Sequence, residues 1–244
     1  MAHLYLIRHG VSEANLDQSV NRREPDHNIA LAPDGHTQAQ RAGEVLAAHI
    51  LAVDNDTTTR VRLLVSPYRR TQQTADNLLI GMNAAGFDTT LVERREINEL
   101  REQSFGLFDG LSDEELIEQY PREHAYYEKH TAFQGEYFAP MPMGESRAMV
   151  CDRVRGTFGA ILRNMECARP VEHTIVVSHG VTIRAFRQAW FYRPWQWTEA
   201  QPNPNNCSIM RIYGSRGQWE ESELFEGFAP MHSRQEEREA GHVE

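Results

Sequence analysis

The chain has 244 residues and a formal net charge of −10, with 25 Lys or Arg against 35 Asp or Glu. This balance argues against a broad surface for nucleic acid or for an anionic membrane, although an acidic protein can still contain a local basic pocket. The sequence has no apolar run of the roughly twenty residues that a membrane span requires, no secretory leader, and no CxxC pair. We therefore expect a soluble, cytoplasmic protein that binds neither nucleic acid nor a membrane.

Three short, β-prone runs, at residues 4–7, 61–65 and 174–177, each lead into polar residues and then a helical pattern. After turn residues at 33–35, apolar side chains spaced three and four apart predict a helix over residues 37–50. Strands that alternate with helices predict an α/β fold, a three-layer αβα sandwich with a mostly parallel central sheet. This architecture buries both the strands and the helical faces.

The second half of the chain adds a loop, a helix and a tail. Aromatic and proline residues at 131–144 predict an ordered loop or lid, and an apolar stripe predicts a helix over residues 145–165. From about residue 231 the chain is charged and has almost no large apolar side chains, which indicates a frayed tail. We therefore predict one domain at residues 1–230 and a flexible tail at 231–244.

Polar residues suited to binding an anion follow each of the three predicted strands. The first junction contains Arg8 and His9, the second contains Arg70 within the run SPYRRT, and the third contains His179. Ligands of open α/β sheets bind beyond the carboxyl ends of the strands. There, arginine can hold phosphate oxygens bidentately and neutral imidazole can attack phosphorus. A glycine follows each histidine, as at Gly180, and lets the backbone approach a bound oxyanion.

Each of these features alone has a common structural explanation. A strand-end histidine is more often structural, an arginine at a helix start more often forms a surface ion pair, and the tripeptide RHG recurs by chance. Two His-Gly pairs and an arginine-bearing junction, each after a predicted strand, instead favour one shared phosphate site. The sequence has no HExxH metal motif and no GxxxxGK-type nucleotide loop.

Several segments carry the motifs of one enzyme family. They are LIRHG at 6–10 followed by Ser12 and Asn15, SPYRRTQQTA at 66–75, LREQSFG at 100–106, MGES at 143–146 and VSHG at 177–180. Together they resemble the histidine phosphatase superfamily, which includes the cofactor-dependent phosphoglycerate mutases and fructose-2,6-bisphosphatase. The resemblance extends from residue 4 to about residue 213.

The resemblance implies a role for each matching residue. It makes His9 the phosphorylated nucleophile and Glu102 the proton donor. The catalytic residues implied in this way are His9, Glu102, His179, Arg8 and Arg70. The implied substrate-binding residues are Arg8, Asn15, Arg70, His179 and Gly180. Because arginines would supply the positive charge, we expect neither a metal nor a cofactor.

The function that follows is a phosphatase that hydrolyses a phosphomonoester of a small metabolite through a phosphohistidine on His9. Its expected ligands are a small phosphorylated metabolite and inorganic phosphate. One alternative is a phosphoglycerate-type phosphomutase, but the sequence lacks the Arg-Arg-Ser-Phe-type stretch of the mutases it resembles after Glu102. The other is a non-catalytic phosphate-binding module of the same fold, against which His9, Glu102 and His179 argue by their presence. The sequence predicts no specific substrate and no oligomeric state.

Four positions leave the substrate open. Val11 stands where many relatives carry Glu or Gln, and Asp109 stands where phosphatase-like members often have the Glu of a Glu-Gly pair. Arg22 and Arg23 lie where family members contact the rest of the substrate. This basic pair fits either a site for a second phosphate or carboxylate, or ordinary surface charge.

Two further assignments depend on surroundings that the sequence does not show. Glu99 competes with Glu102 as the proton donor, because the two would share a face if their segment were helical. The remaining histidines have polar neighbours in sequence, and we predict that they are surface or capping residues: His3, His27, His36, His49, His124, His130, His173, His232 and His242.

Overall fold

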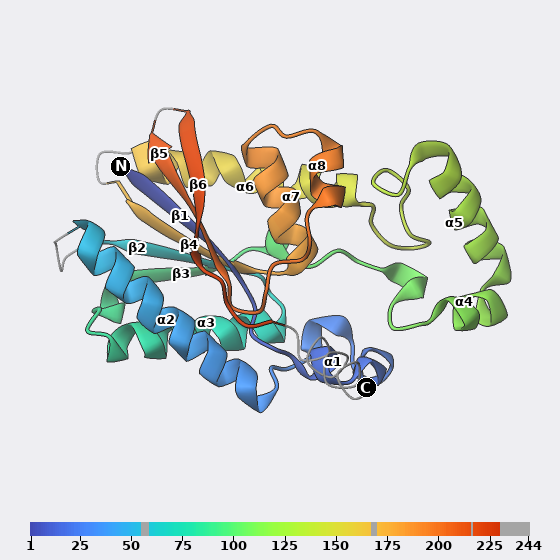
Figure 1. Cartoon of the computed structure of the whole chain (residues 1–244), viewed down its shortest axis with the longest axis horizontal. Coiled ribbons are helices and arrows are strands. Elements are labelled where there is room, and N and C mark those ends of the chain that lie inside the picture. The colour runs from blue at the N-terminus through green and yellow to red at the C-terminus, as the bar shows by residue number, and fades with distance from the viewer. Residues whose placement is uncertain (55–58, 167–169, 216, 230–244) are drawn as a thin grey trace, which may run out of the picture.

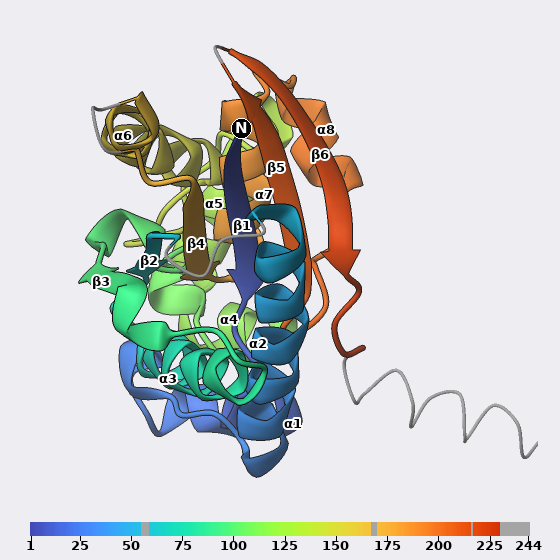
Figure 2. The same cartoon turned by 90° about the vertical axis from the view of Figure 1, so that its left-hand side faces the viewer.

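The computed structural model describes residues 1–54, 59–166, 170–215 and 217–229, and it has a six-stranded sheet with helices on both faces (Figure 1). The strand order is β3-β2-β4-β1-β5-β6, and Figure 2 shows β3 and β6 at opposite edges. The first four strands in this order pair in parallel, and β5 and β6 are antiparallel. The strands are β1 (Ala2–Arg8), β2 (Val61–Val65), β3 (Val92–Glu96), β4 (His173–Ser178), β5 (Ile209–Ser215) and β6 (Gln218–Phe225).

Alternate side chains of the strands enter two separate hydrophobic cores. Tyr5 and Ile7 of β1 pack in the core that α2 and α3 cover, whereas Leu4 and Leu6 pack in the core that α6 and α7 cover. Because a strand buried on both faces needs apolar residues at every position, the pattern confirms the predicted three-layer αβα sandwich. The helices are α1 (Glu13–Leu16), α2 (Pro33–Asp54), α3 (Arg69–Ala84), α4 (Asp113–Gln119), α5 (Pro121–Gln134), α6 (Arg147–Glu166), α7 (Gly180–Trp190) and α8 (Trp195–Ala200).

The three predicted strands are confirmed as β1, β2 and β4, but the helix boundaries differ from prediction. Helix α2 begins at Pro33, so residues 33–35 form its first turn rather than a preceding turn. Proline suits this position because its φ is already helical and its missing N–H would have no intrahelical partner. The predicted loop at 131–144 is wrong at its start, since α5 continues to Gln134. Helix α6 begins two residues after the predicted start at 145, at Arg147.

The prediction that all remaining histidines are surface or capping residues is wrong for His3 and His173. His3 lies in β1 and His173 begins β4, and their side chains are 2% and 0% exposed. The two residues are register partners, with ring centroids 4.9 Å apart. His232, His242 and the predicted tail at 231–244 lie outside the described residues.

Loops and short helices at the carboxyl ends of the parallel strands form the end of the molecule that carries the predicted site. Helices α4 and α5 project from the sandwich on this side (Figure 1), and Phe108 contacts the rings of His124 and Tyr127 in α5.

Among the described helices, none has the length and apolar character of a membrane span. The short 3-10 helices are Gln18–Arg22, Asp26–Asn28, Thr89–Leu91, Asn98–Leu100 and Gly106–Phe108.

Candidate active site

His9 lies just beyond the end of β1, with its backbone and one ring nitrogen fixed. Its N–H donates to the carbonyl of Ser178 at 3.0 Å, and its own carbonyl accepts from the side-chain amide of Asn206 at 3.0 Å. Its Nδ1 lies 2.8 Å from the carbonyl oxygen of Gly10. A carbonyl can only accept, so this bond places the proton on Nδ1 and leaves a lone pair on Nε2. No described residue hydrogen-bonds that Nε2.

Arg8 and Arg70 bring two positive charges to His9. Burial and the charges of Arg70 and Arg8 hold the pKa of His9 well below its usual value, so its imidazole is neutral near pH 7. Arg70 donates from Nη1 to the carbonyl oxygen of Asp26 at 2.6 Å and to its carboxylate at 2.7 Å. Arg8 donates from Nη1 to the carbonyl of Pro204 at 2.6 Å, and its buried Nε has no partner among the described residues.

His179 caps the amino end of α7 and faces His9, with ring centroids 5.2 Å apart. Its side chain is fully buried, and Nε2 lies 2.8 Å from the hydroxyl of Ser66. Nδ1 is buried without a partner among the described residues. Burial, followed by the charges of Arg70 and His9, holds the pKa of His179 well below its usual value.

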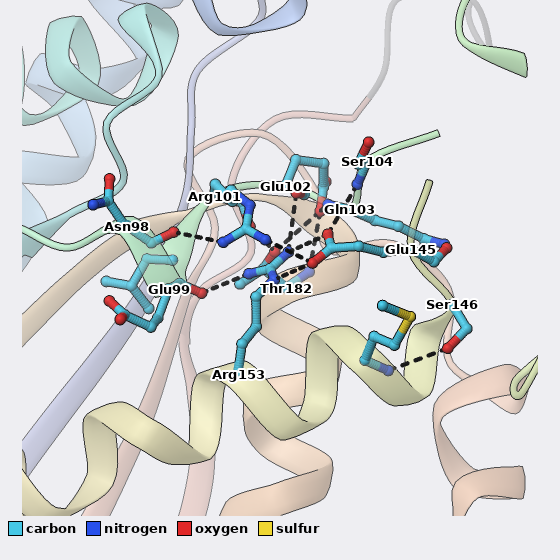
Figure 3. A network of polar contacts seen from close by, with 12 residues as sticks. Asn98, Glu99, Arg101, Glu102, Gln103, Ser104, Glu145, Ser146, Arg153 and Thr182 are labelled. Atoms are coloured by element: carbon cyan, nitrogen blue, oxygen red, sulfur yellow. Dashed lines mark hydrogen bonds and ion pairs between the residues drawn. The ribbon is translucent and has the colours of Figure 1, made fainter. Parts of the chain in front are cut away.

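The carboxylate of Glu102 lies against the first turn of α7 (Figure 3). It accepts from the backbone N–H groups of Thr182 at 3.2 Å and Val181 at 3.4 Å, and from the Thr182 hydroxyl at 3.1 Å. Its charge also acts on Arg8, opposing the effect of burial, which lowers the pKa of that guanidinium. Glu102 is thus linked to the site in two ways. Its carboxylate hydrogen-bonds the first turn of α7, which follows His179, and its charge acts on Arg8.

Glu99, the competing carboxylate, lies elsewhere. The 3-10 helix Asn98–Leu100 ends before Arg101, whose backbone is extended, so Glu99 and Glu102 do not share a helix face. The side chain of Glu99 is exposed, and its carbonyl oxygen accepts from Arg153 at 2.5 Å. The structure therefore brings only one of the two carboxylates to α7 and the cluster at its start.

A network of two partly buried arginines around the buried Glu145 holds the segment that carries Glu102 (Figure 3). Glu145 accepts from Arg101 at 2.8 Å and from Arg153 at 2.9 Å, and Arg153 also donates to the carbonyl of Glu102 at 3.0 Å. Burial raises the pKa of Glu145, but hydrogen bonding and the charge of Arg153 outweigh it, and the net shift is downward. This network was not predicted from the sequence, although Glu145 lies within the MGES segment that resembled a family motif.

Asn15 and Gly180, both predicted substrate-binding residues, make contacts within the protein. The Asn15 side chain accepts from the Ser12 N–H at 3.1 Å in a capping box and lies 3.5 Å from Asn206, which holds His9. A Cβ atom at Gly180 would lie 2.7 Å from the side-chain oxygen of Asn203. Glycine at this position therefore lets the 201–206 segment, which bonds Arg8 and His9, lie against the start of α7.

The structure also shows the surroundings of the four positions that left the substrate open in the sequence. Val11 is buried at 2% exposure. Asp109 is half-buried, and burial together with the charge of Asp26 raises its carboxyl pKa. Arg22 donates to the Gly110 carbonyl at 2.8 Å and pairs with Glu115 at 2.6 Å, and Arg23 pairs with Asp17 at 3.0 Å. Within the described ranges, no three His, Cys, Asp or Glu side chains are arranged to hold a metal ion.

Comparisons with known proteins identify the family of the chain. A model of the histidine phosphatase superfamily (branch 1) matches residues 4–226. The phosphoglycerate mutase-like protein AT74 of Arabidopsis thaliana is 34% identical over 212 residues, which cover 84% of this chain but only 63%, less than two thirds, of that protein. The related Arabidopsis thaliana protein AT74H is 32% identical over 248 residues, covering 96% of this chain and 79% of that protein.

Solved structures share the fold at lower identity. A mycobacterial glucosyl-3-phosphoglycerate phosphatase, solved with VO3, has a TM-score of 0.63 at 22% identity and covers 91% of this chain and 98% of its own. The alpha-ribazole phosphatase of Shigella flexneri has a TM-score of 0.68 at 18% identity and covers 93% of this chain and 98% of its own. The match of the family model over residues 4–226 confirms the resemblance, and the chain belongs to the histidine phosphatase superfamily, whose members are phosphatases and phosphomutases.

Proposed function

We propose that this protein is a phosphatase that hydrolyses a phosphomonoester of a small metabolite through a phosphohistidine on His9. The observation that carries the proposal is the state of His9. Its Nδ1 proton is held by the Gly10 carbonyl, its Nε2 lone pair has no described partner, and the charges of the buried Arg70 and the half-buried Arg8 act on it. A neutral imidazole oriented in this way beside positive charge is a competent nucleophile for a phosphoryl group.

The reaction proceeds in two displacements. Arg8, Arg70 and His179 hold the phosphoryl oxygens while Nε2 of His9 attacks phosphorus in line, and the bond from phosphorus to the leaving oxygen breaks. Glu102 gives that oxygen a proton, so the product leaves as an alcohol. Water then attacks the phosphohistidine while Glu102 takes up a proton, and inorganic phosphate departs with His9 restored.

Contacts of the basic pair support transfer to water rather than to a second phosphorylated ligand. Arg22 pairs with Glu115 and Arg23 with Asp17, so both cations are already engaged within the protein. The neighbouring Asp26 and Asp109 add negative charge next to Arg70, which disfavours a second anion there. The two solved neighbours described above are named as phosphatases, whereas AT74 is named as phosphoglycerate mutase-like.

A quenched reaction with a labelled phosphomonoester tests the proposal. Acid-labile, base-stable label should be found on His9, and excess substrate should yield inorganic phosphate in proportion to alcohol. Label on Ser12, or on no residue, would contradict the covalent step. Efficient interconversion of phosphoglycerates without phosphate release would establish a mutase instead.

Metal independence and a cytoplasmic location stay predictions. Activity should persist in excess chelator, because the proposed mechanism draws its positive charge from Arg8 and Arg70. Loss of activity with chelator and its return on adding a divalent ion would overturn this point. Inorganic phosphate and vanadate should inhibit competitively, since both would meet the same donors.

A further inference from the structure

Ser66 contacts His179 from a rigid position at the end of β2. Its side chain is fully buried, and its N–H donates to the Val177 carbonyl at 3.1 Å. Its carbonyl accepts from the Thr71 hydroxyl at 3.0 Å and from the Gln72 side chain at 2.7 Å. These bonds fix the backbone of Ser66, and its hydroxyl oxygen lies 2.8 Å from Nε2 of His179.

The surroundings of the Ser66 hydroxyl decide which partner donates. The hydroxyl has one proton, and its oxygen also receives the N–H of Tyr68 at 3.4 Å. Among the described residues, Nε2 of His179 is the only acceptor for that proton. If Nε2–H donated instead, the buried hydroxyl proton would have no acceptor, at a cost of about 1–3 kcal/mol. Ser66 thus donates to Nε2, and the neutral His179 ring carries its proton on Nδ1.

We propose that Ser66 is a positioning residue that fixes the tautomer of His179, so that Nδ1–H is available to donate to an oxygen of the bound phosphoryl group. The buried, unpartnered Nδ1 of His179 is the ring nitrogen left for that bond. The proposal rests on the proposed function, because it names the phosphoryl group as the acceptor. It gives two neighbouring histidines different tasks. His9 presents an unprotonated Nε2, and His179 presents a protonated Nδ1.

Nitrogen NMR of the protein labelled at histidine tests the tautomer without any assay of turnover. Protonated and unprotonated ring nitrogens have distinct signals, and the His179 signals are assigned by their absence in His179→Gln. We expect the proton on Nδ1 in the wild-type protein. A proton on Nε2 would overturn the proposal, whatever the outcome of labelling at His9.

Variants then connect the tautomer with binding. Ser66→Ala should lose the single tautomer of His179 and weaken binding of vanadate by about 10-fold to 100-fold, the worth of one hydrogen bond to a charged group. Ser66→Thr keeps the hydroxyl and should restore both. The matched control is Ser178→Ala, since the Ser178 hydroxyl is equally buried but donates to the Leu100 carbonyl at 2.8 Å. This control should leave the His179 tautomer unchanged.

The outcomes distinguish failure of this proposal from failure of the proposed function. If Ser66→Ala leaves the tautomer and vanadate binding unchanged, Ser66 has no positioning role, although His9 can still be the nucleophile. If the tautomer changes but vanadate binding does not, His179 does not donate to the oxyanion. If Ser66→Ala fails to fold, the wild-type tautomer and Ser66→Thr still decide the question.

Discussion

Two pairs of histidines lie at opposite ends of strands β1 and β4, and they differ in their hydrogen-bond partners. His3 and His173 lie at the amino ends with ring centroids 4.9 Å apart, and His9 and His179 lie beyond the carboxyl ends at 5.2 Å. All four side chains are at most 4% exposed. Burial lowers the pKa of every one of them. Burial and a lowered pKa therefore do not distinguish a candidate catalytic pair from a structural one.

Hydrogen-bond partners make the distinction. At the amino end, both ring nitrogens of His173 are satisfied, by Asp54 at 2.7 Å and by the Tyr5 hydroxyl at 2.9 Å. At the carboxyl end, Nε2 of His9 and Nδ1 of His179 have no partner among the described residues. A buried polar atom without a partner is costly and rare in a folded protein. Charge completes the distinction. At the amino end, where Nε2 of His49 is also buried without a described partner, the carboxylate of Asp54 lies against His173, whereas Arg8 and Arg70 act on both His9 and His179.

The largest expected effect compares one histidine from each end. His9→Ala should lower kcat/KM for p-nitrophenyl phosphate by at least ~10³-fold, because the nucleophile is gone. His173→Gln should change this ratio by less than about threefold, since His173 only packs and hydrogen-bonds at the far end of the sheet. Steady-state kinetics of both folded variants provide the measurement. Equal losses would show that the two ends are coupled in catalysis.

The next effect concerns the carboxylate at the carboxyl end. Glu102→Gln should slow hydrolysis of an alkyl phosphate by ~10²-fold to 10⁴-fold, because an alkoxide leaves poorly without a proton. Single-turnover formation of phosphoenzyme from p-nitrophenyl phosphate should be less impaired, since nitrophenolate leaves without help. Glu99→Gln is the matched control, and it should leave both rates nearly unchanged. If Glu102→Gln slows the reactions of both esters equally, Glu102 is not the general acid.

A smaller effect concerns stability at the amino end. Asp54→Ala removes the acceptor for Nε2 of His173 and for the Thr59 hydroxyl at 2.7 Å. Loss of a partner for a buried polar group should lower the free energy of unfolding by about 1–3 kcal/mol. Urea denaturation measures this loss, and Asp54→Asn, which keeps an acceptor oxygen, should lose less. Unchanged stability of Asp54→Ala would mean that this cluster contributes nothing to the fold.

The smallest effect is the pH dependence of stability due to His3. Burial, then the charges of His173 and Arg211, lower the pKa of His3 from 6.5 to about 4. Between these values the unfolded chain binds a proton that the native His3 does not. Stability is therefore fully present above pH 6.5 and falls as the pH drops towards 4.

Replacing His3 isolates this contribution. His3→Gln should reduce the loss of unfolding free energy between pH 6.5 and 5 by roughly 1–2 kcal/mol, as measured by urea denaturation across that range. His27→Gln, at an exposed position, is the control and should leave the slope unchanged. If the unfolding free energy of wild type and of His3→Gln changes equally with pH, His3 does not contribute to the pH dependence of stability.

Local sequence patterns determined the architecture and the end of the sheet on which the site lies. The β-prone runs before Arg8, before Ser66 and before His179 form β1, β2 and β4. Parallel strands have their carboxyl ends at one edge, so residues that follow them meet in space, and the motifs predicted this meeting. Strands β3, β5 and β6 were missed. The edge strands β3 and β6 consist mostly of polar and charged residues, which give a weak local signal for a strand.

Only the tertiary structure decided the surroundings of each titratable group. Ser66 and His179 are 113 residues apart in sequence, and His173 and Asp54 are 119 apart. No local pattern contains such pairs, because strand register and helix packing set them. The register of β1 and β4 buries His3 against His173, and the extended segment after the 3-10 helix Asn98–Leu100 brings Glu102 rather than Glu99 to α7. Residue type and spacing thus predicted the chemistry that we propose for the chain, whereas contacts between distant segments decided the hydrogen-bond partners of each histidine.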